Sequence, residues 1–116
     1  MSRILWALAL PLALLACDDV RKQECERFVA AMKPLDEGTP SSATVDGVIK
    51  QIDAMTFQNQ PLGVYQKNYR KTLEVLVGTL KLKEGGAPPD GTDAVIKQNL
   101  KDARTAREDV ARYCAP

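Results

Sequence analysis

The segment PLGVYQKNYRKTLEVLVGTLKLK, residues 61–83, decides the fold. Its large apolar residues recur at intervals of three and four, close to a seven-residue repeat, which is typical of one buried helix face. Pro61 fits the first turn of a helix, where its missing N–H costs nothing. The β-branched residues of LEVLVGTLKL would also suit a strand, but its apolar positions continue the same stripe. We therefore predict a helix here, with core positions at Leu62, Tyr65, Tyr69, Leu73, Leu76, Val77 and Leu80.

Three further helical segments lie between clusters of helix-breaking residues. The first spans about 18–33 and ends before Pro34. The second spans about 43–55 with Ser42 as N-cap, and the last about 93–113 with Thr92 as N-cap. The breakers are PLDEGTPSS at 34–42 and EGGAPPDG at 84–91. Short connections between amphipathic helices favour an all-α fold, a small antiparallel four-helix bundle.

The bulk composition fits one small globular domain. The chain has 116 residues, of which 45% are hydrophobic and 27% are charged, and its formal net charge is +1. It contains no histidine, which is the commonest general base and transition-metal ligand. Adjacent acids such as Asp36 and Glu37 have no nucleophile or oriented base beside them. We therefore predict no catalytic residues, no metal site and no cofactor.

The N-terminal stretch MSRILWALALPLALLA, residues 1–16, has the architecture of a signal peptide. Arg3 precedes an apolar run that ends in a small residue. A membrane-spanning helix needs about 20 apolar residues, whereas this run is shorter and contains Pro11. We predict removal of residues 1–16 and a mature domain over residues 17–116.

The four residues at the cleavage point, Leu14, Leu15, Ala16 and Cys17, resemble the lipobox of bacterial lipoproteins. The resemblance implies cleavage after Ala16, a diacylglyceryl thioether on Cys17 and acylation of the new amino group. Such chains give stable anchoring at the extracytoplasmic face of a bacterial membrane. Asp18 resembles a signal for inner-membrane retention. Alternatively, Asp18 and Asp19 place favourable negative charge at the start of the first helix.

Lipidation of Cys17 leaves Cys25 and Cys114 as the remaining thiols. Export places them in an oxidising compartment, and each shares the apolar side of its helical segment. We predict a disulfide between them. A redox-active pair or a metal site is disfavoured, because the chain lacks a CxxC spacing and histidine.

Charge is divided unevenly, with the first half of the mature chain acidic and the second half basic. The basic residues could form a face toward anionic headgroups or an acidic partner. The alternative is that they are solvated residues that help helices pair. The candidate basic face consists of Lys67, Arg70, Lys71, Lys97, Lys101 and Arg104.

These features predict a non-enzymatic envelope lipoprotein whose helical domain binds a protein partner or has a structural role at the membrane. Cys25 follows Cys17 by only eight positions, so the domain should lie close to the membrane, with a membrane-proximal partner and no nucleic acid. The alternative is a periplasmic bundle that binds a small ligand or lipid. It predicts an apolar cavity between the third and fourth helices, where alanines and Gly78 thin the packing.

Overall fold

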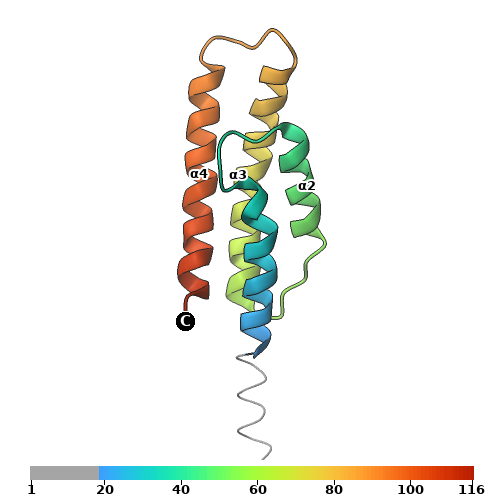
Figure 1. The fold of residues 1–116 in the computed structure, drawn as a ribbon, viewed down its shortest axis with the longest axis vertical. Helices are drawn as coiled ribbons and strands as arrows, with labels where there is room; N and C mark the ends of the chain where they lie inside the picture. The colour runs from blue at the N-terminus through green and yellow to red at the C-terminus, as the bar shows by residue number, and fades with distance from the viewer. Residues whose placement is uncertain (1–18) are drawn as a thin grey trace, which may run out of the picture.

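A computed structural model describes residues 19–116 of the protein, and this part of the chain is a helical bundle without strands (Figure 1). The N-terminal helix spans residues 19–32 and continues into the 3-10 turn η1 (Lys33–Leu35). The other helices are α2 (Ser42–Asp53), α3 (Gln60–Glu84) and α4 (Thr92–Cys114). The all-α prediction is confirmed, and the strand alternative for the middle of α3 is wrong. The predicted signal peptide and Cys17 lie outside the described residues.

Both predicted N-caps are wrong by one residue. Ser41, not Ser42, caps α2, and its hydroxyl accepts the Thr44 N–H at 3.2 Å. Thr92 is the first residue of α4, preceded by Gly91 with a φ of 85°. The Thr92 hydroxyl donates instead to the Pro89 carbonyl at 2.6 Å, because the left-handed turn at Gly91 points this side chain back into the loop.

Helices α3 and α4 lie side by side and run in opposite directions (Figure 1). Near the connecting loop, the Lys83 ammonium lies 2.8 Å from the Asp93 carboxylate. Further along, Asn99 Nδ2 donates to the Thr79 hydroxyl at 2.8 Å. The loop end of this hairpin extends beyond the N-terminal helix and α2 (Figure 1).

Helix α2 packs antiparallel against the second half of α3. Lys81 Nζ lies 3.3 Å from the Asp46 carboxylate, and Arg70 Nε donates to Asp53 at 2.5 Å. At the far end of α3, Glu84 accepts the Ser42 N–H at 2.9 Å and also the Ser42 hydroxyl. These hydrogen bonds lower the pKa of the Glu84 carboxyl, the one from the hydroxyl having the larger effect.

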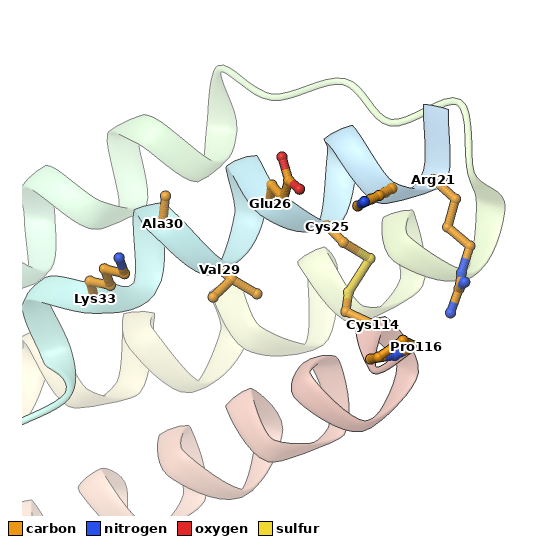
Figure 2. A pocket seen from close by; sticks show the side chains of 9 residues that line it. Arg21, Cys25, Glu26, Val29, Ala30, Lys33, Cys114 and Pro116 are labelled. Carbon is orange, nitrogen blue, oxygen red and sulfur yellow. A yellow bond between two sulfur atoms is a disulfide. The ribbon is translucent and has the colours of Figure 1, made fainter. Parts of the chain in front are cut away.

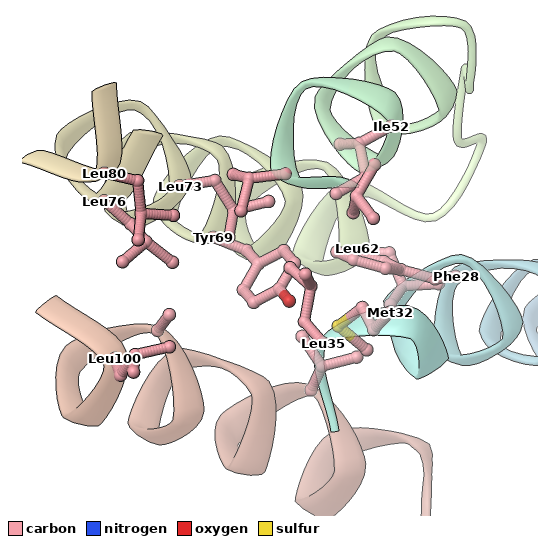
Figure 3. Close-up of a cluster of buried hydrophobic side chains, with 14 of the residues drawn as sticks. Phe28, Met32, Leu35, Ile52, Leu62, Tyr69, Leu73, Leu76, Leu80 and Leu100 are labelled. Carbon is pink, nitrogen blue, oxygen red and sulfur yellow. The ribbon is translucent and has the colours of Figure 1, made fainter. Parts of the chain in front are cut away.

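The core is filled by side chains from all four helices (Figure 3). Phe28 of the N-terminal helix stacks on Phe57 at a centroid distance of 5.4 Å and meets the edge of Tyr69 at 6.2 Å. Burial raises the pKa of Tyr69 to about 12; the nearby Arg107 lowers it less strongly. The predicted α3 stripe is confirmed: Leu62, Tyr69, Leu73, Leu76 and Leu80 are buried, and Tyr65 and Val77 are half-buried.

The space between the buried sides of α3 and α4 is small at the level of Tyr69. Beside Tyr69, Leu100 and Ala103, the open space is about 10 Å³, which is at most room for one water. A Cβ built on Gly78 would meet no atom within 4 Å, so this glycine faces open space rather than thinning the core. Beside these side chains there is therefore no room for a small ligand, and the small-ligand alternative itself stays a prediction.

Candidate functional site

The predicted disulfide is confirmed, and it joins the N-terminal helix to the last residue of α4. Cys25 and Cys114 have a Cα–Cα distance of 5.7 Å and a sequence separation of 89 residues. Cys25 is 5% exposed, whereas Cys114 is half-buried. The bridge therefore lies at the surface end of the core, beside the start of the described chain.

Tyr113 fixes the side chains around this bridge. The Arg21 guanidinium donates to the Tyr113 carbonyl, and its Cζ lies 4.9 Å from the centre of the Tyr113 ring. The Tyr113 hydroxyl donates to Asn59 Oδ1 at 2.8 Å, and the same oxygen accepts the Leu62 N–H. The ring also packs on Tyr65 at 5.4 Å. Arg21 is therefore held against α4 by both charge and stacking.

Glu24 is a buried carboxylate that sequence reasoning missed. It is 3% exposed, and its oxygens accept the backbone N–H groups of Gln58 and Asn59 at 2.7 and 2.9 Å. These donors lie at the start of α3, so the carboxylate joins the N-terminal helix to that helix end. One signal was available: Glu24 lies four residues before Phe28, at a core position of the apolar stripe.

A hollow of about 850 Å³ runs along the N-terminal helix beside the disulfide (Figure 2). We call it the disulfide groove. Its apolar part is lined by Val29, Ala30 and the Cys25–Cys114 bridge. Its charged lining residues are Arg21, Lys22, Glu26 and Lys33, and Pro116 also contributes. An apolar wall with a few charged groups at its edge is typical of ligand sites.

The six predicted basic residues do not all have free charges. Arg70 donates to both Asp53 and Glu74, at 2.5 Å in each case, and these bonds raise the pKa of its guanidinium, Asp53 having the larger effect. Arg104 donates to the Gly38 carbonyl at 2.9 Å. These two residues therefore hold neighbouring segments in place, as the alternative of helix-pairing charges predicts for them.

The remaining four basic residues are exposed, and the structure distributes them over different sites. Lys97 and Arg104 line a second hollow of about 480 Å³ beside Lys83 and Asp93. Lys71 lines a third hollow of about 190 Å³ between α3 and α4, together with Thr72, Val75, Asn99 and Asp102. Lys67 and Lys101 line none of these three hollows. The structure thus brings Lys97 and Arg104 together, whereas Lys71 lines a different hollow and Arg70 is bonded to Asp53 and Glu74.

The large apolar side chains that are exposed in the described bundle all belong to α3 and α4. Val64, Val75, Leu82 and Val95 are between 49% and 59% exposed. On α3, Val75 follows Val64 by eleven residues and Leu82 follows Val75 by seven, which correspond to about three and two helical turns. These three residues therefore lie on one side of the helix. Val75 borders the α3–α4 seam together with Asn99, and Val95 lies one turn before Asn99. We call these four residues the outer face.

Neither metal-binding nor membrane-spanning geometry is found in residues 19–116. No group of three or more Cys, Asp or Glu side chains there could hold a metal ion. No helix in this range is both long and apolar enough to cross a bilayer.

Comparisons with known proteins give no relative for this chain. No family model matches it, and neither the curated proteins nor the solved structures contain a significant match.

Proposed function

We propose that this chain is a bacterial envelope lipoprotein, anchored through Cys17, whose non-enzymatic domain binds a protein partner at the membrane. The proposal includes an antiparallel four-helix bundle for the mature domain, with neighbouring helices clipped by the Cys25–Cys114 bond. The lipobox resemblance of residues 14–17 supports the anchor. Asp18 adds the prediction of inner-membrane retention.

The observation that carries partner binding is the outer face. Four large apolar side chains are exposed on this hairpin, and Val64, Val75 and Leu82 follow one side of α3 at intervals of about 16.5 and 10.5 Å. Polar groups, including Lys71 and Asp102, lie beside Val75 along the seam. An apolar centre with a charged edge is typical of a protein–protein interface. A helix with an apolar stripe, rather than a highly charged surface, is the partner that this chemistry favours.

The argument against catalysis rests on the chemistry of the side chains. The chain has no histidine. The described groups with a shifted pKa are Tyr69, Arg70 and Glu84, and burial or contacts between helices account for each shift. A helical domain that offers a surface to a partner needs no such reactive group.

Photocrosslinking in intact envelopes tests the outer face. A photoreactive amino acid at Val75 or Val95 should give one adduct of defined mass, whereas the same group at Ala43, an exposed position on α2, should not. Leu82→Asp in the crosslinking chain should abolish the adduct without lowering the melting temperature. Equal labelling from Ala43 and from the outer face would contradict partner binding there.

The anchor has a separate test. Mass spectrometry of the mature N-terminal peptide should find an acylated Cys17 with no residue before it. An unmodified Cys17, or one still joined to Ala16, would contradict the lipoprotein proposal.

A further inference from the structure

The disulfide groove combines apolar lining with an excess of positive charge. Val29, Ala30 and the disulfide form the apolar surface, and the methylene stems of Lys22 and Lys33 extend it. Arg21, Lys22 and Lys33 oppose Glu26, the single acidic side chain among the lining residues that the structure describes. An occupant with an alkyl chain and a negative charge would match both parts.

The two lysines are available to an anion. Arg21 already interacts with the Tyr113 carbonyl and ring. In contrast, Lys22 and Lys33 have no ion-pair partner among residues 19–116, and both side chains are exposed. They are eleven residues apart on one side of the helix, or about 16 Å along its axis. The apolar residues Val29 and Ala30 lie between them.

The position of the groove relative to Cys17 points to a lipid; this step rests on the anchor proposed above. Lys22 follows Cys17 by five positions. That interval spans about 7.5 Å in a helix, which keeps Lys22 within a Debye length of the headgroup layer, and at most about 18 Å when fully extended. A basic residue this close to an anionic membrane surface contributes about 1 kcal/mol of attraction.

We propose that the disulfide groove binds one alkyl chain of an anionic phospholipid from the leaflet that holds the anchor. The phosphate lies at Lys22, and the chain follows Val29 and Ala30 toward Lys33. Charge complementarity favours this occupant over a zwitterionic lipid. It also distinguishes the groove from the outer face, where the exposed side chains are apolar and suit a protein.

The test uses the lipidated mature protein in phosphatidylcholine vesicles that contain a phosphatidylglycerol probe with a diazirine in one acyl chain. After irradiation, peptide mapping should place the label within residues 22–33. Lysophosphatidylglycerols should compete with the probe for the groove. Each methylene added to their acyl chain should lower the half-displacing concentration by up to about fourfold, which is the factor for about 0.8 kcal/mol per buried methylene. A probe with a phosphatidylcholine headgroup should label this segment about fivefold less.

Matched variants separate the groove from general membrane contact. Ala30→Trp fills the groove from an exposed position and should reduce labelling at least tenfold, whereas Ala94→Trp, at an exposed position of α4, should not. Lys22→Gln should reduce labelling about fivefold, the factor for 1 kcal/mol, whereas Lys67→Gln on α3 should leave it unchanged. Unchanged melting temperatures show that each variant is folded.

Three results would overturn the proposal. Labelling that is insensitive to Ala30→Trp places the lipid elsewhere. Equal labelling by both headgroups removes the role of charge. In a third experiment, a Cys17→Ser chain is exported by an ordinary signal peptide and is not lipidated. If the probe labels this chain but not the lipidated chain, the groove is occupied by the protein's own acyl group. Failure of the anchor is detected separately by the mass of the N-terminal peptide, so the two proposals fail distinguishably.

Discussion

Replacement of Glu24 by alanine tests how a buried carboxylate stabilises this bundle. Both oxygens accept a backbone N–H at the start of α3, from Gln58 and Asn59. Alanine leaves these donors without their partner. A hydrogen bond to a charged group contributes about 1.5 to 3 kcal/mol, and because both bonds are only part-buried we take the lower value. The two bonds together predict a loss of about 3 kcal/mol in the free energy of unfolding.

Urea denaturation followed by circular dichroism measures this loss, provided that the m-value is unchanged. Glu24→Gln keeps one acceptor oxygen but turns its NH₂ group toward the other backbone N–H. It should therefore lower the free energy of unfolding by at least about half as much as Glu24→Ala does. Glu26→Ala is the matched control, because Glu26 is exposed on the same helix; it should change stability by less than about 0.5 kcal/mol. A Glu24→Ala variant as stable as Glu26→Ala would refute the reasoning.

Three further predictions concern other contacts of the fold. The Cys25–Cys114 bond joins residues that are 89 positions apart in the sequence. Its reduction should lower the free energy of unfolding by about 4 to 5 kcal/mol, measured by denaturation with and without reductant. The Glu84 carboxyl should titrate in NMR below its ordinary pKa of 4.5, and Ser42→Ala should raise this lowered pKa. The contact stabilises the fold above pH 4.5, and this stabilisation is lost as the pH falls through the lowered pKa of Glu84. Tyr69 should ionise near pH 12 in an absorbance titration, at a higher pH than ordinary tyrosines, and a single transition near pH 10 for all tyrosines would contradict this. Its contribution to stability should decrease as the pH rises from 10 to 12.

The helices could be predicted because their apolar spacing directly reflects burial. The α3 stripe from Leu62 to Leu80 needs no partner to be recognised, since the repeat itself defines the buried side. The Cys25–Cys114 pairing could be predicted for a related reason, because each thiol lies on an apolar side and the lipobox resemblance assigned Cys17 to lipidation. The N-caps were less certain, since adjacent Ser41 and Ser42 offer the same chemistry and the loop conformation decides between them.

The features that were not predicted depend on how distant segments meet. The role of Glu24 requires the loop before α3 to cross the N-terminal helix, and no local pattern encodes that crossing. The hollow of about 850 Å³ lies between the N-terminal helix and the end of α4, whereas large side chains such as Tyr69 and Leu100 fill the space beside them between α3 and α4. The basic residues were grouped by charge, yet Arg70 is held by two carboxylates whose positions only the fold reveals.

The disulfide also determines how mechanical force would pass through the molecule. If a partner pulls on Val95 while the N-terminus is held, two covalent routes connect the points of attachment. One follows the chain through α2 and α3, and the shorter one crosses from Cys25 to Cys114 and continues along α4. The shorter route becomes taut first, so α2 and α3 lie outside the loaded covalent path, whereas α4 from Val95 to Cys114 lies within it. With the proposed anchor and partner at these two points, tension would therefore pass through the disulfide and α4.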